Sequence, residues 1–371
     1  MKIAKYLFIA VCLFLFFACT PAQQKNPPQV SIEIKEKCGD GFCDKLEKEK
    51  GICPQDCEMR QQDYKTPEKL YLSMMIHLEG WDDEVENEEK FNGHSNAARK
   101  FLAVFDKYNA KATVEARLEF VKAQNNWGDN VLKEFHEKGH GIGLHADLGG
   151  NAEEIGMSQE DMNQRLTDMK NQFEKLSGIK IQHASGICSS LDWVEAAIKA
   201  GLEFTTGGVA YCVMSMPEED RPEEFKDCES PLYCHDTYPL EVKGRVHPWR
   251  VSDGANWLEH DPNGKLVYFA PENALNWLAE EETGSDAIKK IFDQKDIDAF
   301  MDRMQEALEY TKDGEISTMY VGWSIGDANP DLEVLDSWFA SIQPYVESGQ
   351  VEWMSVNDMY DEFLEWEQNV I

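Results

Sequence analysis

The chain is short of positive charge. Its 371 residues contain 36 lysines and arginines against 69 aspartates and glutamates, which gives a formal net charge of −33. Binding to a phosphate backbone needs dense Lys and Arg, so the composition argues against nucleic acid as a partner. An anionic polysaccharide or an anionic membrane surface would also be repelled, unless a local basic patch or a metal intervened. Neutral ligands, cations and metals stay open.

Several catalytic motifs are missing as well. The sequence has no Gly-x-Ser-x-Gly nucleophile elbow and no phosphate loop of the Gly-Lys-Ser/Thr kind. A serine esterase or a nucleotide enzyme therefore lacks support. The glycine-rich stretch "GHGIGLHADLGG" at 139–150 does not have the spacing of a dinucleotide-binding loop followed by a long helix.

The N-terminus has the pattern of an export signal. Residues 1–19 begin with two lysines, continue as an apolar run and end in "FFAC". This pattern predicts a secretion signal, and Ala18 before Cys19 favours the lipoprotein type with a lipid on Cys19; a plain signal peptide or an uncleaved anchor is the alternative. Residues 20–37 are polar, contain proline and suit a flexible tether to a membrane. We therefore expect an exported, cell-surface protein that meets the membrane through a lipid anchor only.

Cysteine usage agrees with export. Of ten cysteines, two fall in the signal and the remaining even number predicts disulfides. Four of these define a cysteine-rich module at 38–58. Its uneven gaps and interleaved acids favour two disulfides over a zinc site, with a bound calcium as a further hypothesis. The pairing stays open. The cysteines expected to form disulfides are Cys38, Cys43, Cys53, Cys57, Cys188, Cys212, Cys228 and Cys234.

Strand-like and helix-like segments alternate over residues 66–369. Short apolar runs are typical of buried strands, and apolar residues three and four apart are typical of helices. The alternation predicts a parallel sheet covered by helices, either a barrel or an open doubly wound sheet. Residues at about 207–265 break the rhythm and are interpreted as a long insertion. The expected strands are 71–81, 111–116, 140–146, 179–185, 202–208, 265–271, 315–323 and 350–356, and the expected helices are 94–110, 127–139, 158–178, 190–201, 296–314, 329–349 and 357–368.

Histidines and carboxylates gather where these strands end. In either architecture, ligands bind beyond the C-terminal ends of the strands. His77 and Glu79 are two residues apart and so share one face of a strand, and the same holds for His145 and Asp147. His183 lies at the end of another strand. Because imidazole and carboxylate suit zinc and similar ions, we predict His77, Glu79, His145 and Asp147 as metal ligands, with zinc as the expected metal.

The order of several segments resembles a known family. "FLAVFDKYNAKATVEA" at 101–116 is similar to the pattern "LLDLLDKYGVKATFFV" of the polysaccharide deacetylases, or carbohydrate esterase family 4. "VLKEFHEKGHGIGLHA" at 131–146 is similar to their "LLKELAARGHEIGLHS", and residues 173–208 fit the stretch that follows. The similarity covers about 70–208 well and the final strand–helix pairs loosely. It implies a distorted (β/α) barrel, preceded here by the disulfide-rich module.

The resemblance also implies a metal site, from which this chain departs. In the family an aspartate and two histidines hold a divalent metal, a second aspartate is the base, an arginine orients it, and a late histidine is the acid. His145 matches the first metal histidine and Glu79 matches a carboxylate, while His77 replaces an aspartate. The second metal histidine would fall at Gly149, the arginine falls near His183, and the late histidine is missing from 319–327.

Two functions remain. The first is an exported metal-dependent hydrolase that deacetylates an acylated carbohydrate, with Asp147 or His183 supplying the lost ligand. Whichever of Glu79, Asp147 and His183 does not bind the metal would then act as general base.

The alternative is a non-catalytic carbohydrate-binding relative of the deacetylase fold. Its cleft would be lined by aromatic side chains of 246–257, with Trp249 and Trp257 stacking on sugars and Arg250 holding an anion. For substrate binding in either case we expect His94, His247, Trp249, Arg250 and Trp323.

Overall fold

The computed structural model describes residues 69–79, 83–148, 156–207, 210–226, 245–279, 292–311, 315–325 and 331–370. All of them belong to one compact unit, Arg60–Ile371. The predicted signal, tether and cysteine-rich module lie outside the described residues. So do Cys19, Cys38, Cys43, Cys53, Cys57, Cys228 and Cys234. Among the helices that are described, none has the length and apolar character needed to cross a membrane.

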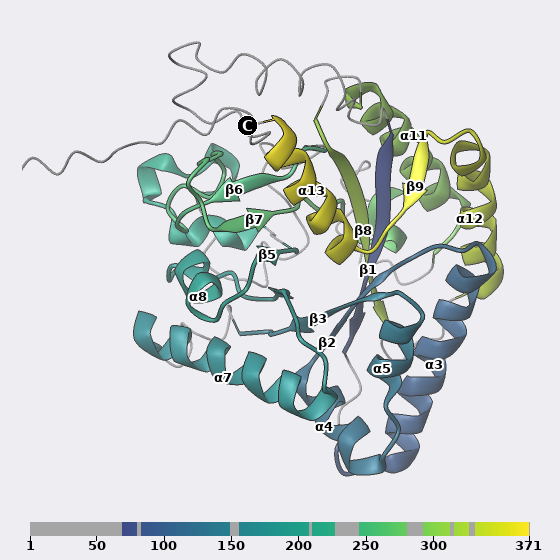
Figure 1. The fold of residues 1–371 in the computed structure, drawn as a ribbon, viewed down its shortest axis with the longest axis horizontal. Coiled ribbons are helices and arrows are strands. Elements are labelled where there is room, and N and C mark those ends of the chain that lie inside the picture. Colours follow the sequence, from purple (N-terminus) through teal and green to yellow (C-terminus); the bar gives the residue numbers. More distant parts are fainter. Residues whose placement is uncertain are drawn as a thin grey trace, which may run out of the picture. The chain divides into compact units, whose positions relative to one another are not determined.

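A nine-stranded sheet forms the centre of the described structure (Figure 1). The strands are β1 (Leu70–Leu78), β2 (Thr113–Ala116), β3 (Gly141–His145), β4 (His183–Ser185), β5 (Phe204–Thr205), β6 (Trp249–Val251), β7 (Leu266–Tyr268), β8 (Ser317–Ile325) and β9 (Val351–Trp353). Their order is β6-β7-β5-β4-β3-β2-β1-β8, with β9 paired to β1. Every pair is parallel except β6 with β7. The predicted strand–helix alternation is thus confirmed as a mostly parallel sheet.

The sheet is forked at β1 and curls towards closure. β8 pairs with β1 along its whole length, whereas on the other side β2 pairs with the C-terminal half of β1 and β9 with the N-terminal half. Thr318 N–H donates to the carbonyl of Val246, and Glu272 N–H donates to the carbonyl of Tyr320. These bonds join β8 to segments that flank β6 and β7, the far edge of the sheet. The result is a half-barrel, consistent with the distorted (β/α) barrel that the sequence resemblance implied.

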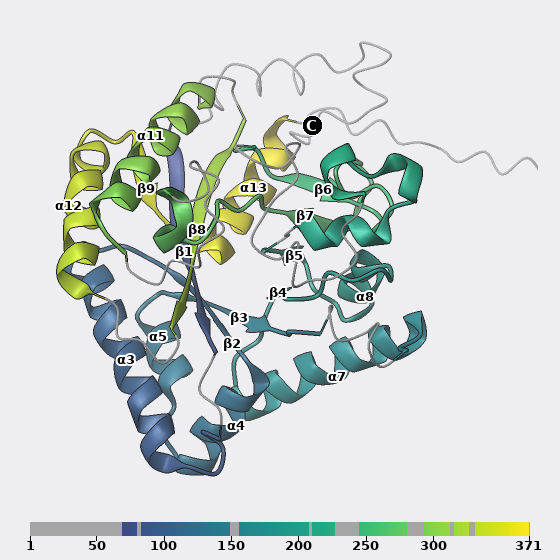
Figure 2. The same ribbon diagram turned by 180° about the vertical axis from the view of Figure 1, so that it is seen from behind.

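Helices surround this sheet, and one helix crosses its inner side. They are α3 (Glu88–Lys107), α4 (Leu118–Trp127), α5 (Val131–Glu137), α7 (Gln159–Ser177), α8 (Trp193–Lys199), α11 (Gln294–Tyr310), α12 (Leu332–Glu347) and α13 (Val356–Val370). Most of them border the strands, whereas α13 crosses in front of β1 and β8 in Figure 1 and behind them in Figure 2. Short 3₁₀ turns are η1 (Ala210–Ser215), η2 (Glu218–Asp220), η3 (Glu223–Phe225) and η4 (Leu275–Trp277).

Capping residues in the sequence predicted some of the helix ends and not others. Ser158 and Asp161 form a capping box at the start of α7, and Gly178 ends it at φ 72°, a left-handed conformation that suits glycine. The helix expected at 94–110 begins earlier, because the Asn87 side chain accepts a hydrogen bond from Lys90 N–H and caps α3.

Alternation along β1 separates two apolar cores. Leu72, Met74 and Ile76 pack in the large cluster beneath the outer helices. Tyr71 and Met75 point to the other face, where they pack in a second cluster. Its other members are Phe204, Val267 and Tyr320 of the sheet, Phe269 and Ile316 next to strands β7 and β8, and Val356, Met359, Tyr360 and Phe363 of α13. The interior of the curled sheet is therefore filled by apolar side chains at the α13 end. On this same inner face, β1 continues to His77 and Glu79.

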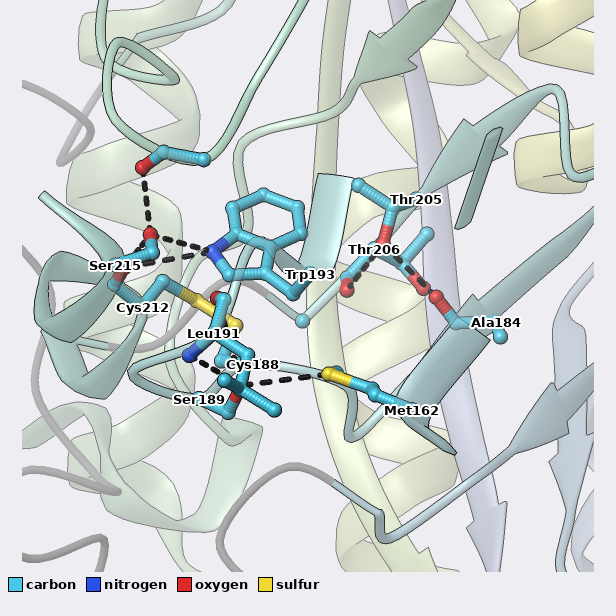
Figure 3. Close-up of a disulfide and its surroundings, with 12 residues drawn as sticks. Met162, Ala184, Cys188, Ser189, Leu191, Trp193, Thr205, Thr206, Cys212 and Ser215 are labelled. Carbon is cyan, nitrogen blue, oxygen red and sulfur yellow. Dashed lines mark hydrogen bonds between the residues drawn. A yellow bond between two sulfur atoms is a disulfide. The ribbon is translucent and has the colours of Figure 1, made fainter. Parts of the chain in front are cut away.

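Two of the cysteines that were expected to form disulfides are joined to each other among the described residues (Figure 3). The disulfide joins Cys188, which follows β4, to Cys212 in η1. Trp193 lies beside it and donates its indole N–H to Ser215 Oγ over 3.1 Å. The disulfide thus links η1, at the start of the predicted insertion, covalently to the segment that follows β4. Further along, the insertion supplies β6, the antiparallel edge strand.

Candidate metal centre

Three side chains meet at the C-terminal ends of β1 and β3. Each of His77, Glu79 and His145 offers a ligand atom, and these atoms lie within 4.8 Å of one another. His145 Nε2 is 2.9 Å from Glu79 Oε2, and His77 Nδ1 is 3.7 Å from Glu79 Oε1. Two ligands held at about 2.1 Å from a tetrahedral ion are roughly 3.4 Å apart. The spacing and the donor set of two imidazoles and a carboxylate therefore fit a divalent ion such as zinc.

Strand register brings these residues together. His77 of β1 lies opposite Glu115 of β2, and Glu115 lies opposite Gly143 of β3. Side chains two residues apart on a strand share a face, so His145 follows Gly143 on the same side as His77. The two imidazole rings stack with their centroids 4.0 Å apart. The i, i+2 spacing in the sequence thus correctly predicted the face on which the three candidate ligands lie.

A buried carboxylate, Glu115, lies beneath the triad and was missed by the sequence analysis. Its side chain has no exposed surface. His77 Nε2 lies 3.1 Å from Oε2, Thr206 donates to Oε1 over 2.5 Å, and the hydroxyl of Ser185 donates to Oε2. Burying a carboxylate without such partners would be costly. The available signal was a glutamate at 115 in "KATVEA", where the family pattern "KATFFV" has phenylalanine.

His183 lies next to the Glu115 carboxylate and is not part of the triad. It is fully buried, stacks on Phe204 with ring centroids 4.5 Å apart, and places Nε2 3.0 Å from Glu115 Oε1. Its other face lies against Gly143, where a Cβ atom would stand 2.1 Å from Nε2. Gly143 is therefore needed for close approach. The expectation that His183 supplies the lost ligand is corrected, because its ring faces Glu115 instead of Glu79.

The charges of this cluster stabilise one another. Burial would lower the pKa of His77, but its contacts with Glu115 and Glu79 outweigh burial and raise that pKa to about 10. Burial would raise the pKa values of Glu79 and Glu115, yet their histidine partners hold both well below the usual range. Two ionised carboxylates therefore flank His77. The same negative charge would favour a divalent cation among these side chains.

Asp147 lies close along the chain but outside the triad. It follows β3 with φ 47°, in the left-handed region, and its side chain is half exposed. Its carboxylate is 3.5 Å from Arg117 Nη2, at the start of α4. The backbone packs tightly there, since a Cβ atom on Gly186 would stand 2.7 Å from the Asp147 nitrogen. The cluster that could hold a metal ion does not include Asp147, whose carboxylate contacts Arg117.

Two histidines expected to bind substrate have structural contacts instead. His94 lies inside α3, is fully buried, and places Nδ1 2.8 Å from the carboxylate of Glu84. His247 donates from Nδ1 to the carbonyl of Ile316 over 3.0 Å. That carbonyl lies at the N-terminal end of β8, the opposite end of the sheet from the triad. Both predictions are corrected for these reasons.

The expected aromatic cleft is also corrected. Trp249 is 1% exposed and donates its indole N–H to the carbonyl of Trp257, which is itself fully buried. Trp323 is 8% exposed and packs in the outer core among side chains that include Phe101 of α3, 5.3 Å away by ring centroid. Arg250 binds the carboxylate of Glu367 with Nε and Nη2, both at 2.5 Å. These side chains stabilise the core and the position of α13.

Comparison with known proteins supports the fold. No protein-family model matches the sequence, and no curated protein is significantly similar to it. Among solved structures, a polysaccharide deacetylase from Mycobacterium smegmatis is 10% identical, with 82% of this chain and 93% of that chain covered and a TM-score of 0.51. Puue allantoinase is 11% identical over 81% of this chain and 91% of that chain, with a TM-score of 0.49. A family 4 acetyl xylan esterase from Clostridium thermocellum, in complex with a cobalt ion, is 12% identical over 78% and 90%, with a TM-score of 0.36.

At these identities the likeness concerns the fold alone, and the structure from Mycobacterium smegmatis carries it. It shows that this chain has the fold of a polysaccharide deacetylase. The fold implied by the sequence resemblance is thereby confirmed.

Proposed function

We propose that this protein is an exported metal-dependent hydrolase that removes an acyl group, in the simplest case acetyl, from a carbohydrate. One observation carries the proposal. His77, Glu79 and His145 converge within 4.8 Å at the C-terminal strand ends of a deacetylase-type half-barrel. This is the end of the sheet at which barrel enzymes bind their substrates.

The triad would hold the metal, and contacts within the triad would keep its donor atoms in place. His77, Glu79 and His145 supply two imidazole nitrogens and a carboxylate oxygen. A divalent ion held there, for which we propose zinc, lowers the pKa of water and polarises an acyl carbonyl oxygen. The stacked rings and the shared contact with Glu79 keep the three donors on one side of the site.

For the general base we propose Asp147. Of the three groups considered, Glu79 contacts both histidines of the triad and His183 is fully buried. Asp147 is half exposed just beyond the end of β3, where its carboxylate lies 3.5 Å from Arg117 Nη2 and is open to solvent and substrate.

The proposed substrate and location rest on further features. The structural neighbour from Mycobacterium smegmatis is named a polysaccharide deacetylase, and a chain of net charge −33 favours a neutral over an anionic carbohydrate. The signal-like residues 1–19 and the Cys188–Cys212 disulfide are typical of proteins in an oxidising, extracytoplasmic compartment. We propose a lipid on Cys19 as the anchor. The alternative, a binding protein with Trp249 and Trp257 stacking on sugars, is weakened because both indoles are buried.

Metal content of the purified protein is the decisive measurement. The protein and a His145→Ala variant would be incubated with zinc, cobalt or manganese, desalted and measured by elemental mass spectrometry. His136→Ala is the matched control, because His136 is an exposed histidine on α5. We expect near-stoichiometric metal in the wild type and the control, and its loss in His145→Ala. A wild type without metal, or a His145→Ala variant with as much, would refute the metal centre.

Activity is tested next with the metal-loaded protein. Acetate release from N-acetylated and O-acetylated oligosaccharides would identify the bond that is cleaved. Asp147→Asn should keep the metal and lose activity by about 10²–10⁴-fold, the usual contribution of a general base. A loaded wild type that releases no acetate from either kind of substrate would contradict deacetylation and leave a metal-binding protein.

A further inference from the structure

We infer that Glu115 is the positioning residue of the candidate metal centre and that it sets which nitrogen of both histidines faces the ion. The inference rests on the proposed function, because it concerns the same triad. It comes from contacts of Glu115 with His77 and, through Ser185, with His145.

The first contact is direct. His77 Nε2 lies 3.1 Å from Glu115 Oε2. A carboxylate oxygen accepts hydrogen bonds, so Nε2 carries the proton of this pair. The other nitrogen, Nδ1, is the one that lies 3.7 Å from Glu79 Oε1 in the triad. His77 is therefore turned with its metal-binding atom outward.

The second contact runs through a hydroxyl. Ser185 donates its only proton to Glu115 Oε2, so its oxygen can only accept from His145 Nδ1, which is 2.8 Å away. Nδ1 of His145 therefore carries a proton, and Nε2 is the nitrogen that would give its lone pair to a metal ion. That Nε2 lies 2.9 Å from Glu79 Oε2. One carboxylate thus orients two imidazoles of opposite tautomer.

Glu115 is itself firmly held. Thr206 donates to its second oxygen over 2.5 Å, and His183 Nε2 lies 3.0 Å from the same oxygen. Because the carboxylate has no exposed surface, it is separated from solvent and does not reach a substrate. Its effect is exerted through the histidines. Mutation of a residue that hydrogen-bonds to a metal ligand typically lowers metal affinity by about 10–100-fold.

The test compares zinc affinities of single variants. Glu115→Gln keeps the shape of the side chain but cannot accept hydrogen bonds at both of its terminal atoms. Ser185→Ala removes the link to His145 and leaves the contact with His77. Glu119→Gln is the control, because Glu119 lies nearby in sequence on the exposed surface of α4. Dissociation constants would be measured by competition with a chelator, with thermal unfolding of the metal-free proteins as a check of folding.

We expect zinc affinity to fall by about 10–100-fold in Glu115→Gln and by about tenfold in Ser185→Ala. The control should stay close to wild type. Imidazole ¹⁵N NMR of the zinc form provides a readout that a purely structural role would not change. The wild type should show a proton on Nε2 of His77 and on Nδ1 of His145, and Glu115→Gln should lose this pattern at His77.

The outcomes separate the inference from the proposed function. A wild type that binds no zinc at the triad refutes the proposed function and, with it, this inference. A wild type that binds zinc, with folded Glu115→Gln and Ser185→Ala variants of unchanged affinity, overturns the inference alone. Should Glu115→Gln not fold, Ser185→Ala decides, since removing one hydroxyl leaves the buried carboxylate with its other partners; unchanged affinity in that variant is the refuting result.

Discussion

Adding one methyl group at Gly143 would test the packing beneath the candidate centre. A Cβ atom there would stand 2.1 Å from His183 Nε2 and 2.4 Å from Cε1. Non-bonded heavy atoms normally meet at about 3.5–4.0 Å, so the ring would have to move by more than roughly 1 Å. It has little room to do so, because Phe204 stacks on its other face.

The cost of Gly143→Ala follows from this clash. Overpacking a filled core costs about 1–3 kcal/mol. We expect the upper part of that range, about 3 kcal/mol, since displacing His183 also disturbs its 3.0 Å approach to Glu115. Gly322 on β8 is the matched control. A Cβ atom there would meet its nearest neighbour, Ala274 Cα, at an ordinary 3.7 Å. Gly322→Ala should therefore change the free energy of unfolding by less than about 1 kcal/mol.

Equilibrium unfolding in urea, with a chelator present to remove metal effects, measures both variants. The double variant Gly143→Ala/His183→Ala completes a mutant cycle. Because the smaller side chain removes the clash, we expect the double variant to be less destabilised than the sum of the single changes by about 1–2 kcal/mol. A Gly143→Ala variant as stable as Gly322→Ala, or a cycle that is additive, would refute the packing described for His183.

Two further predictions concern stability away from the triad. Burial lowers the pKa of His140 to about 4, so between about pH 6.5 and 4 the unfolded chain binds a proton that the folded chain does not. The free energy of unfolding should therefore fall by up to about 3 kcal/mol as pH drops through this window. In His140→Asn it should depend less on pH. The same dependence of the free energy of unfolding on pH in both proteins would contradict this. The Cys188–Cys212 disulfide joins residues 24 positions apart in the sequence. Replacing both cysteines by alanine should therefore lower the free energy of unfolding by about 3 kcal/mol. Non-reducing peptide mapping that finds either cysteine unpaired, or paired with another cysteine, would contradict this disulfide.

Much of the fold could be predicted because its signals are local. Buried parallel strands are apolar and short, and most helices have an amphipathic period or a cap, as at Ser158 and Gly178. The exceptions lack such signals. α4 begins at Leu118, its N-cap residue Arg117 forms no side-chain cap, and the helix was not predicted. β6 has three residues and exists as a strand through its pairing with β7.

The site was predicted only in part, for a related reason. His77, Glu79 and His145 could be placed close together because alternation and strand ends determine which residues reach one face and one edge of a sheet. For the tryptophans, no sequence pattern distinguishes a position in a binding cleft from one in the core. The size and polarity of Trp249 suit a sugar cleft and a core equally, and its burial follows from contacts with distant segments.

The sequence by itself determined the parallel strand–helix alternation, the strands that carry the triad and the donor groups of its three side chains, because each of these depends on residue type and on periods of two or 3.6 residues. Only the tertiary structure decided which polar residues complete the centre. Glu115 meets His77 across 38 residues of chain, Ser185 across 70 and Thr206 across 91. A buried charge is tolerated when such partners converge on it, and that convergence is set by strand order and register, which no local pattern encodes.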